Sequence, residues 1–310
     1  MIVVGGGPAG LSAALVFGRQ RRNVLLVDGG KVRNAPAEEM HMMLSRDGFP
    51  PSRLLEIGRE EVARYPSVEV RAGTVVSAEG ELDDFEVVLG DGTRERGRRI
   101  VLATGQVDEP YPIDGLAERF GRAVFHCPFC HGWEARDSTL AVIGSEAASA
   151  MLAVYLADRF SGDVVLCTHG GDAPEGELAA RLALRGVRVE TAVVSQVTGD
   201  PGDVVVHFSD GRSLRRQALF HRAPTRQHAL LAEQLGCEIL PDGTVRVDEL
   251  QRTTVPGVAA AGDTAKLPAV PDATTLVVLG AGDGVRAAVW MDSDLFRSGL
   301  EKQPAADPAT

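Results

Sequence analysis

The sequence predicts an α/β protein with two Rossmann-like domains, and three observations support this prediction. A short apolar strand, Met1–Val4, runs directly into the glycine cluster Gly5–Gly10 and then into a segment of helical periodicity. The same order of strand, turn and helix returns at Leu140–Tyr155. A chain of 310 residues is also long for one hydrophobic core and suits two domains.

The first unit has the elements that usually surround a dinucleotide-binding turn. A helix is expected over Leu11–Gln20, and a second apolar strand over Val24–Val27 ends at Asp28. The helix would direct the positive end of its dipole at the phosphates of a bound nucleotide. Asp28 follows the turn by about twenty residues, the separation at which an acid accepts a hydrogen bond from a ribose hydroxyl.

The glycines of this turn are expected to have separate roles. Gly5 permits the tight turn, Gly7 lets the backbone approach a pyrophosphate, and Gly10 allows the helix to pack closely on the strand. A merely structural glycine turn is the alternative. Because strand, helix, second strand and terminal acid all agree, the unit predicts nucleotide binding.

The segment Arg33–Pro51 is irregular, and two interpretations of it stay open. It is either a solvated loop with its methionines on the core or a loop folded along a bound cofactor. Helical spacing then covers Leu54–Tyr65, and strands are expected over Val68–Ala72, Gly73–Glu79, Phe85–Leu89 and Arg99–Ala103. The small residues Ala103–Gly105 would let the backbone pass close to a cofactor. Pro110 and Pro112 mark the expected crossover between the domains.

The second unit lacks the glycines that a pyrophosphate needs. The three glycine positions of the first turn hold Gly144, Glu146 and Ser149 here. Glu146 would place bulk and negative charge where a pyrophosphate has to sit. The next strand, Asp163–Cys167, offers neither an acid for a ribose nor an arginine for a 2'-phosphate. The second domain is therefore expected to be a nucleotide fold that has lost its nucleotide.

The rest of the chain continues with apolar strands and one helix. Strands are expected over Val187–Val194, Val204–Phe208, Ser213–Leu219 and Pro256–Asp263, and a helix over Gly280–Asp294. The tail from Glu301 is rich in alanine, proline and aspartate and is expected to fray.

The stretch from His126 to Glu134 carries redox chemistry. Cys127 and Cys130 are three positions apart and can close a small disulfide ring. The flanking His126 and His131 could each lower a cysteine pKa or act as acid or base. Half of a zinc site is the alternative, but the second cysteine pair or the histidine pair that such a site needs is missing. We therefore expect a redox disulfide and no bound metal.

Composition limits the partners and the compartment. The net charge of -11 argues against nucleic acid and anionic membranes, since both attract positive surface. Four cysteines, two of them isolated, do not make a structural disulfide framework, so a cytoplasmic location is expected. Neither a signal peptide nor an apolar run of membrane-spanning length is visible.

With these features, the sequence resembles the low-molecular-weight thioredoxin reductase family of two-domain flavoproteins over nearly its whole length. The resemblance implies FAD as the cofactor, a homodimer and domains of the three-layer ββα type. It implies an FAD domain, residues 1–112 and 246–310, that is interrupted by a smaller insertion, residues 113–245, with the cysteine pair. The residues that it implies around FAD are Gly5, Gly7, Pro8, Ala9, Gly10, Asp28, Arg33, His41, Ala103, Thr104, Gly105, Gly262 and Asp263.

Three departures separate the chain from the reductases of that family. His131 stands where they have an acidic residue, Thr275–Leu276 stands where they have an Arg–Gln pair, and the pyridine-nucleotide fingerprint is lost. The stretch from Cys127 to Glu134 instead resembles the dithiol oxidases that close disulfides in small natural products such as gliotoxin, holomycin and romidepsin.

That resemblance implies a route for the electrons. A small-molecule dithiol would exchange with Cys127, Cys130 would pass two electrons to FAD, and dioxygen would reoxidise the flavin to give hydrogen peroxide. We take His131 as the base, with His126 in reserve; packing histidines are the alternative. Trp133 is expected in the core. A thioredoxin reductase that uses NADPH or ferredoxin, and a non-enzymatic redox sensor, stay open as other functions.

Overall fold

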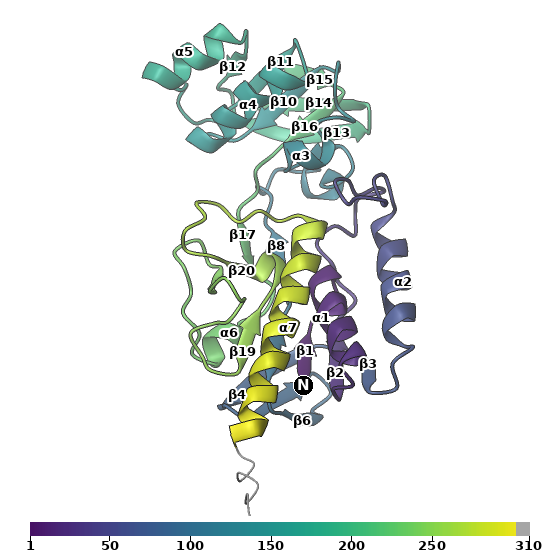
Figure 1. The fold of residues 1–310 in the computed structure, drawn as a ribbon. Helices are drawn as coiled ribbons and strands as arrows, with labels where there is room; N and C mark the ends of the chain where they lie inside the picture. Colours follow the sequence, from purple (N-terminus) through teal and green to yellow (C-terminus); the bar gives the residue numbers. More distant parts are fainter. Residues whose placement is uncertain (302–310) are drawn as a thin grey trace, which may run out of the picture.

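The computed structural model describes residues 1–301 and confirms the α/β fold class, with two five-stranded parallel sheets (Figure 1). The first sheet has the order β19, β7, β1, β2, β3, with bounds Val258–Ala260, Ile100–Leu102, Ile2–Val4, Val24–Asp28 and Val68–Ala72. The second has the order β12, β11, β10, β16, β9, with bounds Arg188–Glu190, Val164–Cys167, Leu140–Ile143, Ala218–Phe220 and Val124–Phe125. We call the parts built on them the first domain and the inserted domain.

Helices cover one face of each sheet, and an antiparallel meander covers the other, so each domain has three layers. The first domain has helices α1, α2 and α7, Pro8–Arg19, Pro51–Val62 and Val277–Glu301, and the meander β4–β6, Val75–Glu81, Asp84–Leu89 and Arg94–Gly97. The inserted domain has helices α4 and α5, Ala147–Arg159 and Gly176–Leu184, and the meander β13–β15, Val194–Asp200, Asp203–Phe208 and Ser213–Arg216.

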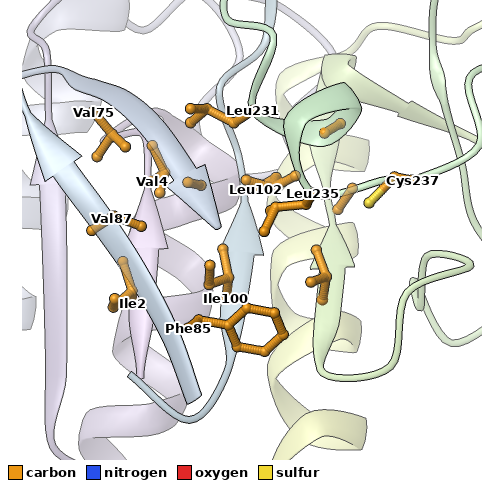
Figure 2. Packing of buried hydrophobic residues seen from close by; sticks show 14 of the residues in the cluster. Ile2, Val4, Val75, Phe85, Val87, Ile100, Leu102, Leu231, Leu235 and Cys237 are labelled. Atoms are coloured by element: carbon orange, nitrogen blue, oxygen red, sulfur yellow. The ribbon is translucent and has the colours of Figure 1, made fainter. Parts of the chain in front are cut away.

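Successive residues of the central strands face these two layers in turn. Ile2 and Val4 of β1 pack with Phe85 and Val87 of the meander (Figure 2), whereas Val3 packs on the helix side. Because both faces of the sheet are covered, every position of β1 is apolar and buried. This is why such strands are continuous apolar runs in the sequence.

Three of the strands expected from the sequence are wrong, because each is divided between two elements in the structure. The expected strand Ser213–Leu219 ends in the meander as β15 and begins again as β16 in the parallel sheet. The chain turns at Gln217, whose backbone N–H donates to the carbonyl of Thr139 at 2.9 Å and whose Oε1 accepts from the Thr139 N–H at 2.9 Å. Two other expected strands divide likewise: Val187–Val194 into β12 and the start of β13, and Pro256–Asp263 into β19 and the short helix η2, Gly262–Thr264.

The chain passes between the domains through two short strands that pair with each other. Strand β8, Gln106–Asp108, lies antiparallel to β17, Thr225–Gln227. After β17, Leu231, Leu235 and Cys237 pack in the core of the first domain (Figure 2). We therefore propose that the second crossing lies at β17, earlier than the predicted division between residues 245 and 246.

The remaining elements are short and connect the layers. They are η1 at Ala117–Arg119, α3 at Pro128–His131, α6 at Leu231–Gln234, β18 at Val245–Arg246 and β20 at Ala265–Lys266. Within residues 1–301, we find no helix with the length and apolar character that a membrane crossing requires. The tail that was expected to fray lies, from residue 302 onward, outside the described residues.

Candidate active site

A deep hollow opens at the carboxyl end of the first sheet, where α1 begins. It encloses about 1720 Å³, open space at its mouth included. The predicted site residues that line it are Gly5, Gly7, Pro8, Ala9, Asp28, Arg33, His41, Ala103, Thr104, Gly105, Gly262 and Asp263 of the first domain and His126, Cys130 and His131 of the inserted domain. The hollow thus brings the glycine turn and the cysteine stretch together.

The three glycines of the first turn have different surroundings. Gly5 has a φ of 111°, and a Cβ on Gly10 would lie 1.8 Å from the Gly5 carbonyl oxygen. Backbone geometry and packing therefore require glycine at both positions. A Cβ on Gly7 would have Val32 as its nearest neighbour, at 3.9 Å. Internal packing leaves room for a side chain at Gly7, so the space beside it is available to a ligand.

Asp28 ends β2 beside the hollow, and its carboxylate is already oriented by the protein. Oδ1 accepts from the backbone N–H of Gly30 at 2.8 Å, and Oδ2 accepts from Arg59 Nη2 at 2.8 Å and from Arg59 Nε at 3.1 Å. Two oxygens offer about four acceptor sites, so these bonds leave acceptor capacity for a ribose hydroxyl. The contact with Arg59 of α2 was not foreseen from the sequence.

Arg33 is held on the wall of the hollow by two carboxylates. Its Nη2 and Nε donate to Asp108 at 2.6 and 2.8 Å, and its Nη1 donates to Asp263 at 3.0 Å. Burial opposes the charge, but these two acids raise the pKa of Arg33 well above its usual value. The group links three distant segments of the chain. Nothing in the sequence around Asp108 pointed to this role.

The cysteine pair forms a disulfide, with the two Cα atoms 5.3 Å apart. Cys127 precedes α3, and the backbone N–H of Cys130 donates to the Cys127 sulfur at 3.1 Å. Pro128 begins the helical turn that brings the sulfurs together. Of the two cysteines, Cys130 lines the hollow, so the disulfide has one member on the side where a cofactor would lie.

Burial lowers the pKa values of both histidines of the stretch. Burial, together with nearby His126 and His41, lowers the pKa of His131 to about 4. Its ring stacks on Phe125 at 4.2 Å between centroids, and within residues 1–301 its buried Nδ1 has no hydrogen-bond partner. Burial and the positive charge of Arg33 also lower the pKa of His126. Both therefore bind a proton weakly at neutral pH.

The lowered pKa of His131 predicts a pH dependence of stability. Between pH 6.5 and the folded-state value of about 4, the unfolded chain binds a proton at His131 that the folded chain does not. The contribution of the neutral His131 to the free energy of unfolding is complete above pH 6.5 and is lost as the pH falls towards 4. From about pH 7.5 to about pH 5, wild type should lose about 2 kcal/mol more of its unfolding free energy than His131→Asn, as measured by urea unfolding.

Two other histidines serve as an internal reference when wild type is compared with His131→Asn. Burial also lowers the pKa values of His126 and His221, and both remain in the His131→Asn variant. The variant should therefore keep part of the slope of stability against pH. An unchanged slope in His131→Asn would contradict the assignment of a buried, neutral His131.

The side chain at the turn of the inserted domain is hydrogen-bonded to other side chains of the chain. Glu146 precedes α4, and its Oε1 accepts from the hydroxyl of Tyr111 while its Oε2 accepts from Ser149 Oγ at 3.3 Å. Burial opposes ionisation, but the hydrogen bonds hold the pKa of the Glu146 carboxyl below its usual range. Tyr111 is fixed further by His221, whose Nε2 accepts the Tyr111 backbone N–H at 3.2 Å.

One expectation about an aromatic residue needs correction, and one contact of a crossover residue was not foreseen. Trp133 was expected in the core but is 65% exposed, with the guanidinium of Arg136 4.1 Å above its ring. Phe129 is 63% exposed beside the disulfide. The role of Tyr111 was also missed. The prolines on either side of it marked the crossover, but they gave no sign that its hydroxyl would reach Glu146.

Comparisons with known proteins agree with this arrangement. The family model described as pyridine nucleotide-disulphide oxidoreductase matches residues 1–287. The chain is 33% identical over 306 residues to thioredoxin reductase tcpT of Claviceps purpurea, covering 95% of this chain and 94% of that protein. It is 34% identical over 281 residues to thioredoxin reductase sirT of Leptosphaeria maculans, covering 85% and 86%. The crystal structure of HlmI matches with a TM-score of 0.89 and 37% identity, covering 97% of this chain and 93% of that chain.

Proposed function

Because the chain belongs to the pyridine nucleotide-disulphide oxidoreductase family, we propose that it oxidises a small-molecule dithiol to a disulfide with dioxygen as the electron acceptor. In general terms, the chain is a flavin-dependent disulfide oxidoreductase with FAD as its cofactor. The cysteine pair beside the hollow is the group that would exchange with the dithiol.

The residues around the hollow fit an FAD molecule. Gly7 leaves space for the pyrophosphate, the start of α1 directs backbone N–H groups and the positive helix end towards it, and Asp28 keeps acceptor capacity for a ribose. Arg33 and Asp263 are hydrogen-bonded to each other on the wall of the hollow. When bound, FAD supplies a two-electron acceptor that dioxygen can reoxidise.

One observation supports an oxidase over a reductase that uses NADPH. The turn that would hold the pyrophosphate of a pyridine nucleotide carries the carboxylate of Glu146, bonded to Tyr111 and Ser149. The pyrophosphate of NADPH at that turn would be repelled by the Glu146 carboxylate and would have to break both of its hydrogen bonds. Electrons are therefore expected to enter through sulfur.

The chain's own residues account for the sulfur chemistry of the proposal. A substrate thiolate attacks the Cys127 sulfur, the disulfide breaks, and Cys130 leaves as a thiolate. The second substrate thiol then attacks the mixed disulfide and releases the product. Both cysteines are left reduced, and the substrate has lost two electrons and two protons. Net transfer to dioxygen gives one hydrogen peroxide for each disulfide formed.

A thioredoxin reductase is the second candidate, because the names of the relatives tcpT and sirT favour it. The two candidates differ in how electrons enter and leave. The homodimer, the cytoplasmic location and the small-molecule class of the dithiol stay predictions from the sequence.

A direct experiment separates the two functions. Under argon, NADPH should leave the yellow holoprotein oxidised over minutes, because Glu146 occupies the nucleotide turn, whereas dithiothreitol should bleach the flavin absorbance. Admission of air should restore the colour and yield about one hydrogen peroxide per dithiol oxidised. Prompt bleaching by NADPH would support the reductase, and a bleached flavin that air fails to reoxidise would exclude the oxidase. Cys127→Ser, mixed with dithiothreitol, is the matched control and should stay yellow.

A further inference from the structure

A third histidine reaches the cysteine site from the first domain. His41 lies in the irregular segment between β2 and α2, and its side chain is only 14% exposed. It lines the same hollow as Cys130 and His131. Its position also contributes to the low pKa of His131, so the two rings are close enough to interact electrostatically. The segment that carries His41 therefore contributes directly to the surroundings of the disulfide.

His41 is surrounded by carboxylates, one of which comes from the inserted domain. Its Nε2 lies 3.5 Å from Glu134 Oε1 and 3.8 Å from Glu39 Oε2, and its Nδ1 lies 3.5 Å from Asp47 Oδ1. Asp47 is itself held by the backbone N–H of Met42 at 2.8 Å. Three carboxylates, two from the same loop and one from the inserted domain, therefore lie beside this ring.

The contact with Glu134 ties this ring to the disulfide segment. Glu134 lies four positions after Cys130, in the turns that follow α3. The contact therefore joins the loop of the first domain to the segment that carries both sulfurs. It would fix the distance between the imidazole and the disulfide when the two domains are in this arrangement.

The two histidines next to the cysteines are less suitable as proton acceptors. The pKa of His131 is lowered to about 4, and its buried Nδ1 has no partner within residues 1–301. His126 is buried beside the positive charge of Arg33. A general base is most effective when its pKa lies near the working pH, so burial makes both groups weak bases.

We propose that His41 is the base of thiol exchange at the Cys127–Cys130 disulfide and that Glu134 is its positioning residue. This rests on the dithiol exchange of the proposed function. His41 takes the proton of the substrate thiol while the substrate sulfur attacks the sulfur of Cys127. The bond between the enzyme sulfurs breaks, and Cys130 leaves as a thiolate whose negative charge is balanced by the imidazolium. No further oxidant takes part in this step.

The test uses the anaerobic half-reaction, in which dithiothreitol bleaches the flavin of the holoprotein. His41→Ala should slow bleaching about 100-fold with its FAD content unchanged, and added imidazole should restore part of the rate. Glu134→Gln should slow bleaching about tenfold, because the neutral amide no longer holds the ring by its negative charge. His207→Ala removes a histidine that bonds Thr198 on the meander, and it is the matched control with a wild-type rate.

Three results would overturn the proposal. One is a His41→Ala rate within about twofold of wild type, since general-base catalysis contributes more than that. Another is a slow variant that imidazole does not rescue, which would make the role structural. The third is a variant that loses FAD but bleaches at the wild-type rate once FAD is added back, which would assign His41 to cofactor binding. Dioxygen is absent throughout, so a failure of the oxidase proposal would appear separately, as a wild-type flavin that air does not reoxidise.

Discussion

Cys127→Ser is expected to abolish the proposed dithiol oxidation and to leave FAD bound. Serine has no sulfur, so it can neither form the disulfide nor be attacked by a substrate thiolate, and the exchange step is lost altogether. Cys130→Ser should be equally inactive, because the disulfide cannot re-form. Turnover with dithiothreitol, followed as oxygen uptake, should fall by about 1000-fold or more in either variant. The flavin absorbance per protein should equal that of wild type, because Gly5–Gly10 and Asp28 are unchanged.

The other two cysteines provide matched controls. Cys167 and Cys237 are buried, and burial raises the pKa of Cys167 to about 12 and that of Cys237 above its usual value. Both thiols are therefore protonated and inaccessible at neutral pH. Cys167→Ala and Cys237→Ala should keep wild-type turnover. Retained turnover in Cys127→Ser would remove sulfur exchange from the mechanism.

The sequence predicts the layered fold well where a local pattern decides the structure. The apolar strand before Gly5 and the helix after it lie where they were expected, because both faces of β1 are buried and the turn needs glycine. The strand after the cysteine stretch, Leu140–Ile143, also begins the second unit of strand, turn and helix where that unit was expected. In these segments, short-range chemistry and tertiary packing require the same residues.

Prediction is poorer where the partner of a segment lies far away in the sequence. No local signal divides Ser213–Leu219, because both halves are β-forming and only the change of sheet at Gln217 separates them. Asp108, which binds Arg33, and Tyr111, which binds Glu146, come from the crossover, where side-chain contacts depend on how the two domains meet. Trp133 lies at the surface with Arg136 over its ring, and residue type alone does not reveal that.

Gly7→Ala should weaken FAD binding by about tenfold or more while the protein still folds. Gly7 has an extended backbone, with φ -76° and ψ -176°, that alanine adopts without strain. The added methyl would stand 3.9 Å from Val32 and project into the free space at the start of α1. The ligand, and not the protein, would therefore meet the clash, at the point where a pyrophosphate approaches the backbone. Titration of the apoprotein with FAD, followed by flavin fluorescence, measures the loss.

Two further glycines separate cofactor contact from folding. Gly10→Ala would place a methyl 1.8 Å from the Gly5 carbonyl oxygen, so it should reduce the stability of the apoprotein as well as FAD binding. Gly299→Ala lies in α7 with no atom within 4 Å of the new methyl, and it should keep the wild-type affinity for FAD. A Gly7→Ala protein that binds FAD as tightly as wild type would mean that the cofactor does not approach this turn, and the location of the flavin site would have to be reconsidered.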